Sequence, residues 1–88
     1  MIKPSAYEIR ITARARKDID KLDSKLKKKL KEILLEVISE NPRQGKKLLS
    51  DLLGSYSYRL TYKDRIVYSI DETKRIVYIE RTRTHYGD

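Results

Sequence analysis

The chain has 88 residues, about one domain, and a chain this short buries only about 60–65% of the surface that it exposes when unfolded. It has no cysteine and a single histidine, which excludes disulfides, thiolate chemistry and any site that needs two imidazoles. The 21 lysines and arginines against 13 acidic residues give a net charge of +8. This charge favours a polyanionic partner, nucleic acid before a membrane surface, over a surface that is charged only for solubility.

The beginning of the chain predicts a strand and then a short helix. No signal-peptide region opens the sequence and no apolar run approaches the roughly 18 residues of a membrane span, so we expect a cytoplasmic protein. Tyr7, Ile9 and Ile11 alternate with polar residues, as in a half-buried strand. Thr12 then stands where its side chain can cap a helix. The apolar residues of that helix recur at helical spacing and are Ala15, Ile19 and Leu22.

Residues 24–41 predict a longer amphipathic helix of about four turns. Its apolar stripe consists of Leu26, Leu30, Ile33, Leu34, Val37 and Ile38. Asp23 and Ser24 can cap its start, and Asn41 ends it because a residue before proline avoids helical geometry. The connection to the first helix is so short that the two should form an antiparallel hairpin.

The second half of the chain predicts three strands after a basic connection. Residues 42–54 form this connection, with one short turn around residues 47–53 as an option. Residues 56–62 and 66–70 alternate apolar and polar, residues 71–74 form a polar turn, and residues 75–81 are apolar on both faces, as in a central strand.

A pairing of Tyr62 with Ile66 would place all the alternating apolar residues of the first two strands on one face. These residues are Tyr58, Leu60, Tyr62, Ile66, Tyr68 and Ile70. The opposite face would carry polar and cationic residues, among them Arg59, with Arg65 at or beside the turn. For the third strand, a turn of two or four residues puts Val77 and Ile79 inside, whereas a turn of three puts Ile76 and Tyr78 inside.

The predicted fold class is α+β, with the order β-α-α-β-β-β in a single domain over residues 1–88. The helical hairpin covers one face of a small, mostly antiparallel sheet. The other face is left open and cationic.

The last residues of the chain have the side chains that RNA cleavage requires. Arg81 and Arg83 match phosphate oxygens, His85 can give or take a proton near neutral pH, and Tyr86 can stack on a base. Together they suit attack of a ribose 2′-OH on the adjacent phosphate without a metal or another cofactor. The structural alternatives are surface arginines, a solvated histidine and a packing tyrosine.

Three segments, residues 52–60, 65–68 and 83–86, resemble the RelE/ParE superfamily of type II toxins. The ending Arg-Thr-His-Tyr is most similar to the YoeB-like branch. The resemblance implies a RelE-like fold and a ribosome-dependent endoribonuclease that cuts mRNA in the A site. It also implies a heterocomplex with a RelB-like antitoxin, the free toxin being a monomer or a dimer.

Carried over by position, the resemblance assigns a role to each candidate residue. Arg65 and Arg83 would contact the scissile phosphate. His85 would donate or accept a proton, and Tyr86 would stack on or orient the nucleotide. Arg59 matches a position that is often basic and faces RNA.

One position departs from the YoeB-like pattern. Lys46, with Lys47 beside it, stands where that branch has a glutamate general base. Either Lys46 with a lowered pKa or His85 could be the base, so the acid and base roles stay open. We expect Lys46, Lys47 and Arg81 to bind substrate together with Arg59.

The resemblance leaves two other functions open. A ParE-like toxin would poison DNA gyrase without RNA chemistry, and a degenerate toxin would only bind its antitoxin. In each case the charge of +8 predicts an acidic, partly disordered antitoxin that folds on binding. We expect part of it to form a helix in a groove between the two helices and the sheet edge.

Overall fold

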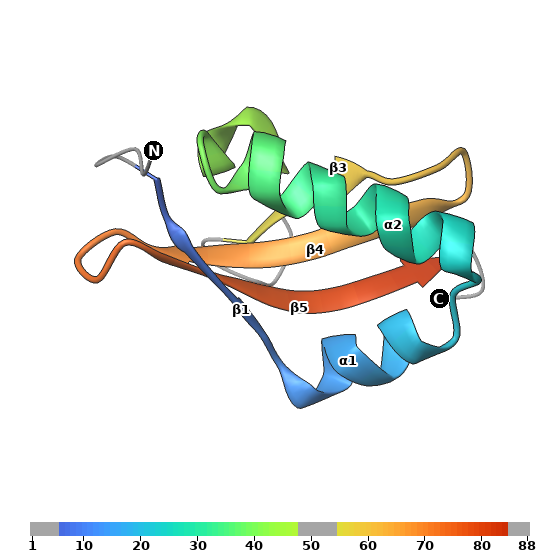
Figure 1. Ribbon diagram of the computed structural model, residues 1–88. Coiled ribbons are helices and arrows are strands. Elements are labelled where there is room, and N and C mark those ends of the chain that lie inside the picture. Colours follow the sequence, from blue (N-terminus) through green and yellow to red (C-terminus); the bar gives the residue numbers. More distant parts are fainter. Residues whose placement is uncertain (1–5, 48–54, 85–88) are drawn as a thin grey trace.

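The computed structural model describes residues 6–47 and 55–84, which form a five-stranded sheet with two helices (Figure 1). In chain order the elements are β1 (Glu8–Ile11), α1 (Ala13–Asp20), α2 (Ser24–Ile33), the π-helical turn η1 (Leu34–Ile38), the 3-10 turn η2 (Pro42–Gln44), β2 (Lys46–Lys47), β3 (Ser55–Arg59), β4 (Asp64–Asp71) and β5 (Ile76–Thr84). The strand order is β1-β5-β4-β3-β2, and only the β1–β5 pair is parallel. The predicted α+β class is confirmed, and β2 is a strand that the sequence did not predict.

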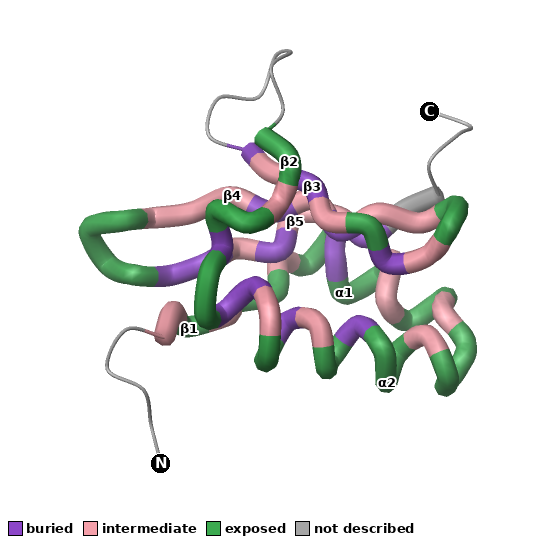
Figure 2. The backbone as a smooth tube through the Cα atoms, turned by 90° about the horizontal axis from the view of Figure 1, so that it is seen from above, coloured by how far each residue is buried: buried purple, intermediate pink, exposed green. Residues whose placement is uncertain are grey.

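Both helices begin at the predicted caps. The Thr12 hydroxyl accepts a hydrogen bond from the Ala15 amide (3.2 Å), and the Asp23 carboxylate accepts one from the Leu26 amide (2.9 Å). Both helices lie on one side of the sheet (Figure 2). No helix in the described part of the chain is long and apolar enough to cross a membrane.

The core lies between these helices and the sheet. It is formed by Ala15, Leu30, Leu34, Ile38, Leu60, Ile66, Tyr68, Val77 and Ile79. Val77 lies opposite Ile70 and Ile79 opposite Tyr68, since residues 72–75 form a four-residue turn. The alternative with Val77 and Ile79 inside is therefore the one that the structure adopts.

The register of β3 and β4 corrects one prediction. Ile66 pairs with Tyr58 rather than with Tyr62, so the pairing partner shifts by four residues and the centre of the turn lies two residues earlier than expected. Tyr62 lies in that turn with 87% of its surface exposed, and its predicted place in the core is wrong. The predicted faces of the strands still hold, because an even shift in register leaves every side chain on its own face.

Candidate functional site

A row of arginine positions crosses the sheet on the face away from the helices. Arg59 of β3 lies opposite Arg65 of β4, and Arg65 lies opposite Arg83 of β5. The neighbouring Ile66 is fully buried against the helices, so strand alternation directs Arg65 and its partner Arg59 to the other face. Within the described residues, no helix covers this open face (Figure 2).

This arrangement is unfavourable unless an anion is present. Like charges on directly opposite residues of a sheet repel each other, and their Cβ atoms are roughly 4.5–5.5 Å apart. Neither Arg59 nor Arg65 forms an ion pair with an acidic residue of the described chain. Arginine forks match the oxygens of a phosphate, so the row suits a phosphodiester.

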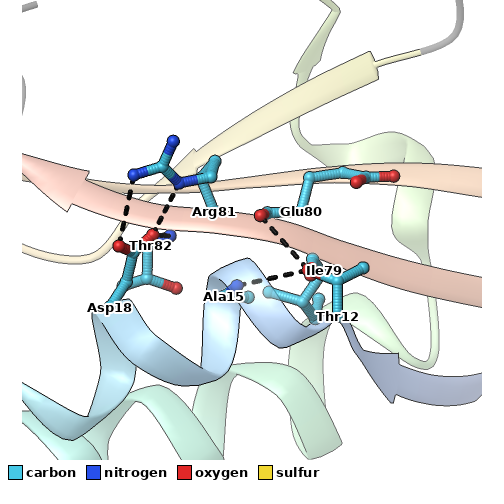
Figure 3. Close-up of polar contacts among 7 residues, drawn as sticks. All are labelled: Thr12, Ala15, Asp18, Ile79, Glu80, Arg81 and Thr82. Atoms are coloured by element: carbon cyan, nitrogen blue, oxygen red, sulfur yellow. Dashed lines mark hydrogen bonds and ion pairs between the residues drawn. The ribbon is translucent and has the colours of Figure 1, made fainter.

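Arg81, two residues before Arg83, is held differently (Figure 3). Its Nε donates to Asp18 Oδ2 of α1 at 2.8 Å, and its Nη2 lies 3.3 Å from Asp18 Oδ1. The backbone amide of Thr82 also donates to Asp18 Oδ2, at 3.0 Å. Arg81 is one of the predicted substrate-binding residues, and the structure gives its guanidinium an acidic partner inside the chain.

The Asp18 carboxylate fixes the end of β5 where β1 no longer pairs with it. The hydrogen bond from Arg81 holds the pKa of Asp18 below its usual range, and the Thr82 amide acts in the same direction against the effect of burial. The Asp18 side chain is only 12% exposed. This contact anchors the backbone two residues before Arg83.

The remaining predicted site residues divide into two groups. Lys46 pairs with Ser57, which shares the face of Arg59, while Lys47 pairs with Tyr56 on the helix side. Both lysines are exposed. His85 and Tyr86 lie outside the described residues, as does the side chain of Arg83.

The structure adds two grooves to this site. The basic groove, of about 480 Å³, lies beside the end of β3, and its lining includes Lys29, Gly45, Lys46, Arg59, Thr61 and Tyr62. The apolar groove, of about 370 Å³, is lined by β1 and the two helices. Its lining consists of Ile9, Ile11, Ile19, Leu30, Leu34 and Leu35 together with Lys27 and Lys31.

Sequence reasoning missed Asp18 and the exposed position of Tyr62. The contact of Asp18 with Arg81 spans 63 positions of the chain and has no local signal. The place of Tyr62 in a turn could have been predicted, because Thr61 and Asp64, which flank residues 62 and 63, are residue types typical of turns.

Comparisons with known proteins agree with this fold. The family profile described as the ParE toxin of the type II toxin–antitoxin system parDE matches residues 9–86. Curated proteins yield no match.

Solved structures of toxins match over nearly their whole length. A chain of the toxin–antitoxin complex RelBE2 from Mycobacterium tuberculosis has 31% identity and a TM-score of 0.84, with 98% of each chain covered. The isolated RelE toxin of E. coli has 29% identity and a TM-score of 0.76, covering 94% of this chain and 88% of RelE. The YoeB dimer of Staphylococcus aureus has 30% identity and a TM-score of 0.74, covering 92% of this chain and 99% of YoeB.

Proposed function

Because the chain belongs to the ParE toxin family, within the RelE/ParE superfamily, it is a toxin of a type II toxin–antitoxin system, and we propose that it is an endoribonuclease that cleaves mRNA on the ribosome. The observation that carries this proposal is the row of arginine positions 59, 65 and 83 on the open face. A toxin that acted only by binding another protein would have no need to place Arg59 and Arg65 opposite each other without an acidic partner in the described residues.

In the proposed reaction the ribose 2′-oxygen attacks the adjacent phosphorus, and the bond from phosphorus to the 5′-oxygen breaks. The products are a 2′,3′-cyclic phosphate and a 5′-hydroxyl. Negative charge grows on the phosphate oxygens in the transition state, and Arg65, flanked by Arg59 and Arg83, would stabilise it.

Two proton transfers complete the proposed step. The 2′-hydroxyl loses a proton to a base, and the 5′-oxygen gains one as it leaves. Lys46, at the edge of the open face, and His85 are the proposed groups for these transfers. Tyr86 would orient the nucleotide.

We propose that the antitoxin binds the apolar groove. Its lining is apolar except for Lys27 and Lys31, so an acidic amphipathic segment would match both its surface and its charge. Leu35 and Ile11 in this groove are 54% and 39% exposed, and binding would bury them. The similar structures include the toxin–antitoxin complexes RelBE2 and YoeB–YefM.

The activity is tested by adding the purified protein to ribosomes that translate a defined message and mapping the cuts by primer extension. We expect cuts that require translation and leave 5′-hydroxyl ends. The same preparation is added to a DNA gyrase supercoiling assay, because the matching family profile is that of ParE. Loss of supercoiling without cleavage of the message would replace the nuclease proposal by the gyrase alternative.

The antitoxin site is tested with the acidic product of a neighbouring reading frame. Leu35→Asp should weaken its binding, since it places a charge in the apolar groove, while Lys74→Gln on the β4–β5 turn should leave binding unchanged. Equal binding by both variants would place the antitoxin elsewhere.

A further inference from the structure

Tyr62 is exposed on a turn that is held in place. Five hydrogen bonds close the turn around it. The Leu60 and Thr61 amides donate to the Asp64 carbonyl, the Thr61 hydroxyl donates to the Asp64 carboxylate (2.9 Å), and the Lys63 and Asp64 amides donate to the Thr61 hydroxyl (3.1 and 3.0 Å). A tyrosine that projects 87% of its surface from a fixed turn contributes nothing to the core. It presents a flat aromatic face to solvent at small entropic cost.

Tyr62 stands in the lining of the basic groove, and so do three cations from three different elements. These are Lys29 of α2, Lys46 of β2 and Arg59 of β3. None of the three forms an ion pair with an acidic side chain in the described ranges 6–47 and 55–84. The groove therefore combines an exposed aromatic ring with three positive charges that no acidic side chain of the described residues neutralises.

The wall of the groove is also fixed. A Cβ atom on Gly45 would lie 2.2 Å from the Tyr68 hydroxyl and 2.8 Å from the Ser57 carbonyl oxygen, so the backbone at Gly45 packs directly on its neighbours. The Tyr68 hydroxyl in turn donates to the Pro42 carbonyl at 2.6 Å. Lys46 follows this packed segment, so its position relative to Arg59 is set by the core.

From these observations we infer that the basic groove is a subsite for single-stranded RNA, in which Lys29, Lys46 and Arg59 contact phosphates and one unpaired base stacks on Tyr62. A single strand is required because the bases of a duplex are stacked on one another and cannot reach the ring. The inference rests on the proposed function. Arg59 belongs both to the groove and to the arginine row, so the groove would hold the nucleotides next to the scissile phosphate.

The test measures binding alone. The probe is a fluorescent hexauridylate with 2′-O-methyl groups, which lacks the attacking hydroxyl, and affinity is read by anisotropy over a series of salt concentrations. Tyr62→Ala should weaken binding about tenfold or more, whereas Tyr62→Phe, which keeps the ring, should stay within about twofold of the parent. Lys29→Gln should lower the slope of log affinity against log salt by about 0.7.

Lys74→Gln is the control for charge, because Lys74 lies on the β4–β5 turn and not in the groove. In Lys74→Gln the slope of log affinity against log salt should equal that of the parent. Adding Tyr62→Ala to this variant should weaken binding by the same factor as in the parent. Binding by Tyr62→Ala within twofold of the parent, or a Lys74→Gln effect equal to that of Lys29→Gln, would overturn the subsite. Because this probe cannot be cleaved, the result is independent of whether the protein cuts translated message.

Discussion

On the helix side of the sheet Ile66, Tyr68 and Ile79 are fully buried, whereas on the open side Arg59 and Arg65 lie opposite each other without an acidic partner in the described chain. The same strands build both faces, so local structure does not explain the difference. The covered face follows the requirements of stability, which are apolar contact and, except at the Thr82 hydroxyl, satisfied hydrogen bonds. The open face departs from them where a phosphate would sit, and we therefore expect substitutions on the two faces to affect different properties.

The largest effect on stability should come from Ile66→Ala. This side chain is completely buried in the core, and truncation leaves a cavity. We expect a loss of about 2–5 kcal/mol in the free energy of unfolding, measured by urea denaturation. Arg65→Ala, one residue away on the open face, should change it by less than about 0.5 kcal/mol. Equal losses of unfolding free energy in Ile66→Ala and Arg65→Ala would mean that the two faces contribute alike to stability.

Tyr68→Phe tests a polar contact of the covered face. The Tyr68 hydroxyl donates to the Pro42 carbonyl, and its removal leaves a buried acceptor, so we expect a loss of about 1–3 kcal/mol. Burial raises the pKa of Tyr68 to about 12, so ionisation should remove stability as the pH rises from about 10 toward 12. Unfolding curves in that window should be less sensitive to pH in Tyr68→Phe, and an unchanged pH dependence would contradict this assignment.

Asp18→Asn tests whether the contact between Asp18 and Arg81 stabilises the folded protein. Loss of charge-assisted hydrogen bonds at this partly buried site should destabilise the protein by about 1–3 kcal/mol. Because the pKa of Asp18 is lowered in the folded protein, its contribution is present above the unfolded value near 4 and is lost as the pH falls through the folded one. The variant should therefore lose less stability below about pH 4 than the parent. Acid unfolding curves of the same shape for Asp18→Asn and the parent would show that the contact with Arg81 does not stabilise the fold.

Thr82→Val should have the smallest effect and the opposite sign. The Thr82 hydroxyl is buried and has no hydrogen-bond partner in the described part of the chain. Valine has nearly the same shape without the unsatisfied oxygen, so we expect unchanged stability or a gain of up to about 1 kcal/mol. A clear loss in thermal unfolding would indicate a partner for this hydroxyl.

The covered face could largely be predicted from the sequence. Period-2 alternation assigned Ile66 and Tyr68 to the core, and Thr12 and Asp23 marked both helix starts. Alternation fixes a face but not a register, and for this reason Tyr62 was misplaced. The register depends on the turn formed by Thr61 and Asp64.

The open face was predictable only in part. Arg59 and Arg65 could be placed there from the strand pattern, but their direct opposition depends on the register. β2 is two residues long, too short to leave a pattern, and Asp18 meets Arg81 only through the tertiary fold. His85 and Tyr86 stay predictions of the sequence.

In the proposed reaction the arginine row stabilises the phosphate during cleavage. The most direct measurement is single-turnover cleavage of message on translating ribosomes by Arg65→Ala, with Lys74→Gln as the matched control and thermal unfolding of both variants. We predict a rate about 10²–10³-fold below that of the parent for Arg65→Ala, with an unchanged melting temperature, and the parent rate for Lys74→Gln. Cleavage by folded Arg65→Ala at the parent rate would show that the arginine row does not stabilise the transition state.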